Sequence, residues 1–270
     1  MLAIIDAIVL GIIEGLTEFL PVSSTGHLIV AGQALDFKDS HDIFTVVIQV
    51  GAIAAVLWYF REDLIGRLQG LVRRDKTAIQ FWKLLVIASI PAGLLGLAMD
   101  NVMEKITVPV VVAVALIVGG IILWLVDRKP VPKQDVKPNI DGIKTRQAWL
   151  VGLGQCVAII PGVSRSGATI VSALATGMDR ATATAFSFYL SIPILIAASG
   201  YKLVAHGDSL DDISGGVTAI IVGAVFAFIT ALLAVSWLLH YVARHNFKPF
   251  AYYRILAGIT ILVLVWTGTL

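Results

Sequence analysis

The amino-acid sequence predicts an all-α polytopic membrane protein, with six transmembrane helices and two re-entrant helical hairpins in an inverted-topology repeat. Composition is the first observation: 58% of the 270 residues are hydrophobic, 14% are charged, and the mean hydropathy is +0.90. A soluble domain is far less apolar than this. Long charge-free stretches are the second observation. The third is a polar motif that occurs once in each half, which is typical of a site between membrane repeats.

Six stretches without a charged residue are long enough, or nearly so, to cross about 30 Å of hydrocarbon as helices. They are 43–60, 84–99, 107–126, 181–201, 213–239 and 255–270. The single cysteine, Cys156, excludes an intramolecular disulfide framework. The N-terminus has neither the basic region nor the small-residue cleavage site of a removable signal peptide.

The distribution of charge predicts the topology. Lys and Arg cluster in 61–83, 128–146 and 244–254, whereas acidic residues dominate 100–105 and 206–212. The positive-inside rule places the three basic segments in the cytoplasm and the two acidic segments outside. With these assignments the six spans alternate in direction without conflict.

This alternation leaves two segments, 1–35 and 148–178, that must enter and leave the membrane on the same face. The first contains Pro21 and Gly26, and the second contains the break Pro161-Gly162. Re-entrant hairpins are tolerated only where they are buried in protein or line a wet cavity. We therefore expect residues 1–126 and 148–270 to be two repeats of opposite orientation within one membrane domain, joined by a cytoplasmic linker at 127–147.

The first motif runs from Gly11 to His27 and contains two carboxylates. Glu14 and Glu18 are four residues apart and share one helix face. Such a pair predicts a site for one divalent cation, Mg²⁺ or Ca²⁺, that keeps some of its waters. Proton transfer is a second possibility, and a surface pair on a frayed N-terminal helix is the structural alternative.

A run of hydroxyl residues, Ser23-Ser24-Thr25, precedes Gly26 and His27. Ser and Thr cap helices well, so a cap alone explains one of them. Backbone amides at a helix start also bind anions. His27 adds a general base, a nucleophile or a metal ligand, or it is a satisfied polar group in a membrane segment.

The second motif, from Gly152 to Thr169, repeats this pattern with a permanent charge at Arg165. A guanidinium offers planar, bidentate donors that suit phosphate oxygens. An arginine at membrane depth needs an anionic partner or a water-filled cavity. A structural ion pair with Glu14 or Glu18 is the alternative, and it is compatible with a later role in substrate binding.

These two motifs resemble those of the bacterial undecaprenyl-diphosphate phosphatase family of the bacitracin-resistance type. The resemblance covers essentially the whole chain. It implies a hydrolase that converts undecaprenyl diphosphate to undecaprenyl phosphate and phosphate, which recycles the lipid carrier of peptidoglycan synthesis. It also implies a divalent cation and a multi-pass protein of the inner membrane whose site faces the periplasm. Bacitracin would compete by sequestering the lipid substrate.

The motifs and the resemblance together predict the site. We expect Glu14, Glu18, Ser24, His27 and Arg165 to be catalytic, with Glu14 and Glu18 as metal ligands. The expected substrate-binding residues are five further hydroxyl residues that flank the two breaks: Ser23, Thr25, Ser164, Ser166 and Thr169. The attacking group is Ser24 activated by His27, which we favour, or His27 itself, or water.

A transporter is the alternative class, because inverted repeats with broken helices also characterise secondary transporters. In that case Arg165 would be the anion clamp of a transporter or of a lipid-carrier flippase. The combination of two glutamates, a histidine and several hydroxyls favours the hydrolase. Small-residue faces at Gly93–Gly96 and Gly119–Gly120 permit a homodimer. We expect no nucleic-acid partner.

Overall fold

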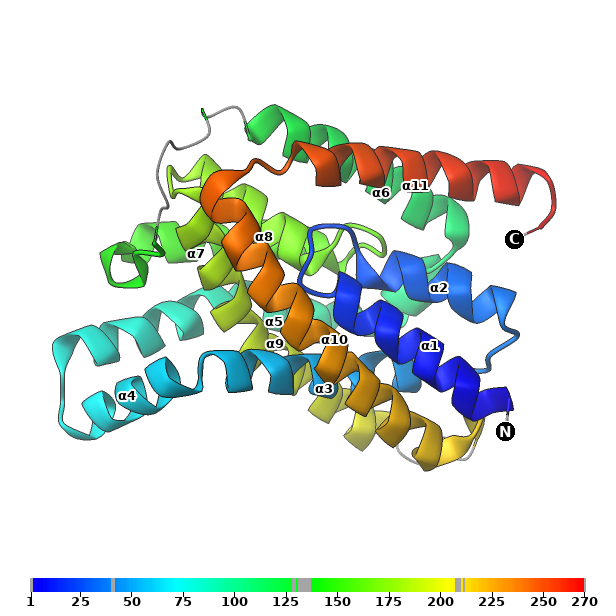
Figure 1. Ribbon diagram of the computed structural model, residues 1–270, viewed down its shortest axis with the longest axis horizontal. Helices are drawn as coiled ribbons and strands as arrows, with labels where there is room; N and C mark the ends of the chain where they lie inside the picture. The colour runs from blue at the N-terminus through cyan, green and yellow to red at the C-terminus, as the bar shows by residue number, and fades with distance from the viewer. Residues whose placement is uncertain are drawn as a thin grey trace.

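The computed structural model describes residues 2–39, 42–127, 130, 137–206, 210 and 212–269, and the regular structure of these residues is entirely helical (Figure 1). The α-helices are α1 (Leu2–Thr17), α2 (Ser24–Ala34), α3 (Ile43–Tyr59), α4 (Arg61–Val72), α5 (Lys76–Ile106), α6 (Pro109–Val126), α7 (Thr145–Gln155), α8 (Arg165–Ala175), α9 (Arg180–His206), α10 (Gly216–Arg244) and α11 (Lys248–Trp266). Short 3₁₀ turns occur at Ile140–Gly142 (η2) and Cys156–Ile159 (η3). Much of the predicted linker, and Asp208 and Asp211 of the acidic segment, lie outside the described residues.

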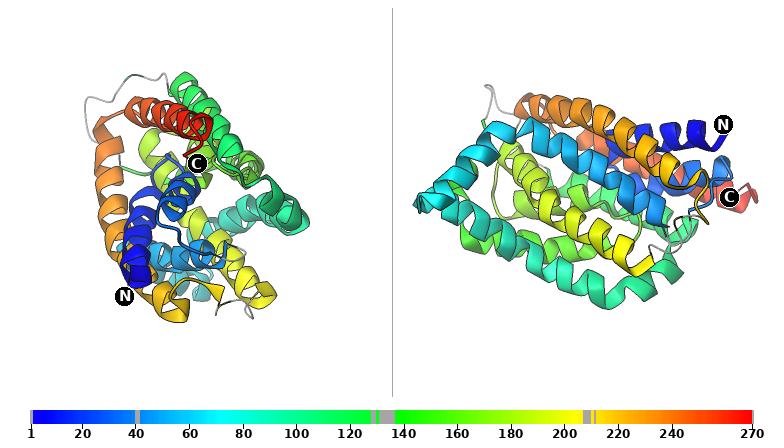
Figure 2. Two further views of the ribbon diagram at one scale, coloured as in Figure 1. Left: turned by 90° about the vertical axis from the view of Figure 1, so that its right-hand side faces the viewer. Right: turned by 90° about the horizontal axis from the view of Figure 1, so that it is seen from below.

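Five of these helices are long and apolar enough to cross a membrane: α5, α6, α9, α10 and α11. The pair α3 and α4, bent by 76° relative to each other, makes a sixth if it is counted as one broken span. The prediction of a polytopic all-α membrane protein is therefore confirmed. Figure 2 shows the long helices running roughly parallel to one another.

Two boundaries differ from the sequence-based expectation. Helix α5 begins at Lys76 rather than at 84, because Asp75 caps it by accepting from the backbone N–H groups of Thr77 and Ala78. Helix α11 begins at Lys248 with Pro249 in its first turn, a position that favours proline. Arg254, which we assigned to the basic segment 244–254, therefore lies inside a span, and that assignment is wrong.

Both predicted hairpins consist of a helix, a break and a second helix. In the first, residues 18–23 connect α1 to α2, and in the second, η3 and residues 160–164 connect α7 to α8. Helix α1 packs mainly along α10, and α7 packs along α5, so each hairpin lies against a long helix of the other half. These contacts are close: a Cβ atom at Gly11 would collide with the carbonyl of Gly223, and one at Gly152 would lie 2.5 Å from the carbonyl of Ala88.

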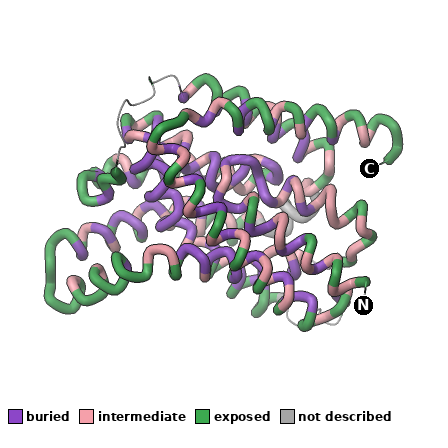
Figure 3. Tube along the Cα trace, viewed as in Figure 1, coloured by how far each residue is buried: buried purple, intermediate pink, exposed green. Residues whose placement is uncertain are grey.

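The remaining helices surround the hairpins. Helices α3 and α9 pack together, as do α6 and α11, and α9 is the most buried of the spans. Figure 3 shows buried residues concentrated in the centre of the molecule and exposed residues on the outer helices. In Figure 1, α4 and its turn into α5 lie at the left end and both termini lie at the right end. The opposite orientation of the two repeats in a membrane stays a prediction.

Candidate active site

The two hairpin breaks are built in the same way. Ser23 caps α2 with φ +72°, and its hydroxyl accepts from the backbone N–H of Gly26 at 3.4 Å. Ser164 caps α8 with φ +71°, and its hydroxyl accepts from Gly167 at 3.0 Å. A positive φ at a residue other than glycine costs about 1–3 kcal/mol and persists only where the surroundings enforce it. Such strain is most common at functional sites, and here it occurs at the corresponding residue of both motifs.

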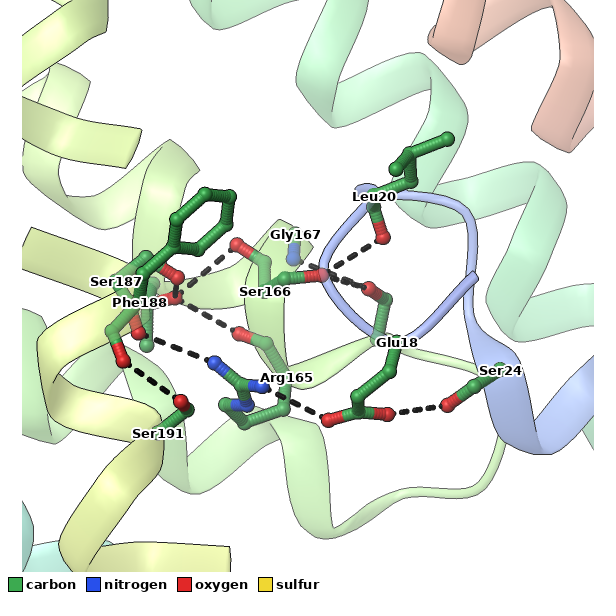
Figure 4. A network of polar contacts seen from close by, with 11 residues as sticks. Glu18, Leu20, Ser24, Arg165, Ser166, Gly167, Ser187, Phe188 and Ser191 are labelled. Atoms are coloured by element: carbon green, nitrogen blue, oxygen red, sulfur yellow. Dashed lines mark hydrogen bonds and ion pairs between the residues drawn. The ribbon is translucent and has the colours of Figure 1, made fainter. Parts of the chain in front are cut away.

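A chain of polar contacts joins the two hairpins (Figure 4). The hydroxyl of Ser24 donates to Glu18 Oε2 at 2.5 Å, and Arg165 Nη2 donates to Glu18 Oε1 at 2.8 Å. The second terminal nitrogen of Arg165 donates to the backbone carbonyl of Ser187 on α9 at 3.1 Å. This ion pair is the structural alternative that the sequence allowed, and it selects Glu18 rather than Glu14. The Nε atom of Arg165 is buried and has no hydrogen-bond partner among the described residues.

The hydroxyl groups of the second motif mostly bond within the protein. Ser166 donates to the carbonyl of Leu20, in the first hairpin, at 2.8 Å and lies 3.0 Å from the Ser164 hydroxyl. Thr169 contacts the Ser187 hydroxyl at 2.6 Å. Ser166 and Thr169 are fully buried. These contacts hold the second motif against the first hairpin and α9, and a substrate-binding role for Ser166 and Thr169 stays a prediction.

His27 faces away from this chain of contacts. Its Nδ1 donates to the carbonyl of Ser23 at 2.6 Å, which leaves Nε2 to accept from the hydroxyl of Tyr253 on α11 at 2.5 Å. The two rings are stacked with centroids 5.6 Å apart. Ser24 is thus paired with Glu18 and not with His27, the base that the sequence favoured.

A cavity of about 280 Å³ lies between the two breaks. Its polar lining includes six of the predicted residues: Glu18, Ser23, Ser24, Thr25, Ser164 and Arg165. Gln49 of α3 and Thr107 of the α5–α6 turn also line it. Glu14 and His27 are not part of this lining. The cavity therefore combines nucleophilic, acidic and cationic groups from both motifs.

Glu14 lies one helical turn before Glu18 on α1 and is completely buried. Both of its carboxylate oxygens are without a hydrogen-bond partner among the residues that the structure describes. An unpaired buried carboxylate is costly unless a cation or proton satisfies it. The described residues contain no cluster of three or more His, Cys, Asp or Glu side chains that could hold a metal ion. A Mg²⁺-like cation that takes one or two carboxylates and completes its shell with phosphate oxygens and water would satisfy the Glu14 oxygens.

Two buried residues were not among the predicted site residues. Arg254 is 1% exposed, and its guanidinium donates to the carbonyls of Pro21 in the first break and of Gly162 and Val163 in the second. The signal for its burial was Pro249, which marks the start of α11. Gln155 is 2% exposed and occupies the position in the second motif that Glu14 has in the first, three residues after a glycine. That correspondence was visible in the sequence.

Comparisons with known proteins agree with the motifs. The protein family described as Bacitracin resistance protein BacA matches residues 7–260. The chain is 46% identical to undecaprenyl-diphosphatase 1 of Burkholderia cenocepacia, covering 99% of this chain and 97% of that protein. It is 45% identical to undecaprenyl-diphosphatase 2 of Rhodospirillum rubrum, with the same coverage. It is 42% identical to the undecaprenyl-diphosphatase of Cupriavidus metallidurans, covering 98% and 97%.

Proposed function

The chain belongs to the bacitracin resistance protein BacA family, and on this premise we propose that it is an undecaprenyl-diphosphate phosphatase. It hydrolyses undecaprenyl diphosphate to undecaprenyl phosphate and inorganic phosphate, and so recycles the lipid carrier of peptidoglycan synthesis. Relatives that match over nearly the whole chain carry this enzyme name. They support the hydrolase and give no support to the transporter or flippase alternative.

One observation carries the mechanism: the continuous contact from Ser24 through Glu18 to Arg165 in a buried cavity. It combines a nucleophile, a proton acceptor and a phosphate-binding cation. Phosphoryl transfer through a covalent intermediate uses these three groups around one phosphorus atom. We therefore assign the proton-accepting role to Glu18, in place of the His27 that the sequence favoured.

In this mechanism the Ser24 oxygen attacks the terminal phosphorus, and its proton passes to Glu18 Oε2. The bond from that phosphorus to the bridging oxygen breaks, and the prenyl monophosphate leaves with the electron pair. Glu18 passes this proton on to the departing prenyl monophosphate and becomes a carboxylate again. Water then attacks the phosphoserine while Glu18 takes a proton from that water, and the Ser24 oxygen leaves phosphorus and regains its proton from Glu18. The short Ser24–Glu18 contact of 2.5 Å is within the range for direct proton transfer.

Arg165 binds the phosphate oxygens and stabilises their charge as the bridging bond breaks. Its buried, unpartnered Nε is a donor available to substrate while Nη1 stays on the Ser187 carbonyl. The ring of Phe19 lies 5.6 Å from the guanidinium and covers it on one side. The hydrogen bond to α9 holds the guanidinium in place before substrate binds. A charge that is already oriented stabilises the transition state more strongly in a low-dielectric site.

A divalent cation, Mg²⁺ or Ca²⁺, belongs to the proposal, with Glu14 as its main protein ligand. When bound, it would neutralise part of the diphosphate charge. Both Glu18 oxygens already have partners, Ser24 and Arg165, so Glu18 would contribute to the cation only by exchanging one of them.

We place the protein in the bacterial inner membrane with its site open to the periplasm. The basic elements at α4 and at the α10–α11 turn lie at the end opposite both termini (Figure 1). By the positive-inside rule that end is cytoplasmic. Thr107, which lies two residues after the predicted outer segment 100–105, lines the cavity. Sequestration of the lipid diphosphate by bacitracin and formation of a homodimer remain parts of the proposal.

Phosphate release from a C55 prenyl diphosphate by the purified protein tests this function. We expect release that EDTA abolishes and that Mg²⁺ or Ca²⁺ restores. Arg165→Ala should lower kcat by at least about 1,000-fold, because loss of an arginine that stabilises phosphoryl transfer has effects of this size. Exposed Arg146→Ala is the matched control. Failure of the well-folded wild type to release phosphate with any cation would overturn the proposal and make lipid or anion flux into liposomes the next measurement.

The nucleophile has its own test. After rapid quenching with substrate labelled in the terminal phosphate, we expect label on the wild type and none on Ser24→Ala. His27→Gln should still be labelled, since His27 bonds to Tyr253 rather than to Ser24. Label that persists in Ser24→Ala and disappears in His27→Gln would make His27 the nucleophile. Labelling of neither the wild type nor a variant would indicate attack by water.

A further inference from the structure

A second cavity, of about 440 Å³, lies between α5 and α9 beside the catalytic one. The two cavities share Ala158, Ile159 and Arg165 as lining residues. Unlike the catalytic cavity, the second one is lined mainly by apolar side chains. Arg165 is therefore the common element of a polar and an apolar compartment.

The walls of this cavity are shaped by small residues. A Cβ atom at Gly93 or Gly96 of α5 would meet nothing within 4 Å. Small residues in membrane helices usually allow close helix packing, but in this chain these two glycines face open space. Prolines interrupt both walls nearby, with Pro91 in α5 and Pro193 in α9. Proline removes a helical hydrogen bond, so each wall has a backbone carbonyl without its usual helical partner near the cavity.

Gln155 is the unexplained polar residue of the lining. It is 2% exposed, and neither its Oε1 nor its Nε2 has a hydrogen-bond partner among the described residues. An unsatisfied buried amide destabilises a protein by about 1–3 kcal/mol. The buried, unpartnered Nε of Arg165 lines the same cavity. Two unpaired donors in one cavity indicate a ligand with acceptor oxygens.

We propose that this cavity binds the prenyl phosphate half of the substrate, with Gln155 donating to the phosphate that remains on the lipid. The first isoprenoid units lie against Gly93 and Gly96, and the terminal phosphate occupies the catalytic cavity. The inference rests on the proposed function and deepens it. Because Arg165 borders both cavities, the bridging oxygen between the two phosphates lies beside its guanidinium. A lipid diphosphate suits this pair of compartments, since one end of it is polar and the other apolar.

Filling the cavity tests the apolar part. Gly93→Leu and Gly96→Leu place new side chains in open space without a clash, so both variants should fold. We expect each to raise the KM for the C55 prenyl diphosphate about ten-fold, the effect of excluding a few methylene groups. Gly200→Leu on α9 is the matched control, because it is exposed, has the same open surroundings and is not part of the lining. KM values within two-fold of the control for both variants would overturn the proposal.

Gln155→Leu tests the polar part, and stability and binding should move in opposite directions. If Gln155 is a substrate ligand, the variant keeps or raises its Tm, because an unsatisfied buried amide is removed, and its KM rises about ten-fold. If Gln155 only supports the fold, the Tm falls and the KM stays constant, which would overturn the proposal. Gln155→Glu should bind even less well, because it sets a carboxylate against a phosphate.

A binding measurement separates this inference from the proposed function. Farnesyl monophosphate resembles the product and needs no turnover. It should raise the Tm of the wild type and of Gly200→Leu, and raise it much less for Gly96→Leu and Gln155→Leu. Equal shifts in all four proteins would refute the site even if phosphate release is normal. Normal shifts without phosphate release would instead refute the proposed enzyme and leave the binding site intact.

Discussion

The breaks of the two hairpins share a backbone and differ in chemistry. Ser23 and Ser164 have nearly the same φ and cap the following helix through the same bond, to the N–H three residues on. The next residue is Ser24 in the first break and Arg165 in the second. One break thus supplies the hydroxyl and the other the cation. The backbone geometry is duplicated, whereas the reactive groups are divided between the copies.

This division gives the two breaks complementary charges in the candidate site. Glu18 has no acidic counterpart in the second break. Ile159 occupies the corresponding position there, six residues before Arg165, as Glu18 lies six residues before Ser24. Two arginines or two glutamates facing each other in a buried cavity would repel, whereas one of each forms the 2.8 Å ion pair.

Arg254 is the contact that both breaks share. It donates to Pro21 and Gly162, which occupy corresponding positions, and to Val163. It also donates to the carbonyls of Ala115 and Leu116 on α6. A single guanidinium on α11 therefore sets the distance between the breaks, and with it the Glu18–Arg165 contact.

The largest expected effect on activity comes from changing Arg165, the positively charged residue of the second break. Arg165→Lys keeps the charge but loses the planar fork that contacts Glu18 and Ser187 together. We expect kcat to fall by at least about 100-fold, the usual effect of removing a donor that stabilises the transition state. Steady-state phosphate release measures it, with exposed Arg146→Lys as the control. A loss below three-fold would show that the charge alone suffices.

The next largest effect comes from removing the Arg254 guanidinium, which should destabilise both breaks together. Arg254→Met leaves several buried carbonyls without a donor and should lower the free energy of unfolding by about 3 kcal/mol. Hydrogen exchange should rise in residues 20–24 and in residues 161–166 together, with a loss of activity. Leu256→Met, exposed on the same helix, is the control. Faster exchange in only one break would contradict the shared clamp.

A smaller effect is expected at Glu14, whose position in the second motif is occupied by the amide Gln155. Glu14→Gln gives the first motif the amide of the second and should lower activity about ten-fold at saturating Mg²⁺, with more Mg²⁺ needed for half-maximal rate. Second-sphere and ligand changes at metal sites have effects of about 10–100-fold. The titration of activity with Mg²⁺ measures this. An unchanged Mg²⁺ dependence would remove Glu14 from the cation site.

The smallest effects concern the two caps. Ser23→Ala and Ser164→Ala should each lower the free energy of unfolding by about 1 kcal/mol, the usual loss for a helix N-cap. Denaturant unfolding in detergent measures it. Ser89→Ala, whose hydroxyl bonds only to a carbonyl one turn earlier in α5, is the control. Clearly unequal losses at the two caps would show that the breaks are not equivalent.

Local sequence patterns determined the fold class and named candidate residues for the site. Charge-free stretches indicated the spans, because hydrocarbon excludes charge over a length that can be counted in residues. The two motifs named Glu18, Ser24 and Arg165, and they predicted that an arginine at this depth would need an anionic partner. These conclusions depend only on neighbouring residues and on the solvent around them.

Tertiary structure decided which groups meet. Glu18 and Arg165 are 147 residues apart, and Pro21 and Arg254 are 233 apart. No local pattern can predict such distances, because they depend on how α1, α8 and α11 pack. Proximity in the sequence favoured His27 as the partner of Ser24. In the structure α11 packs so that Tyr253 hydrogen-bonds to His27, and Ser24 donates to Glu18 instead. The same packing turned Arg254 from an apparent loop charge into a buried clamp, because its hydrogen bonds to five carbonyls replace the water that it gives up.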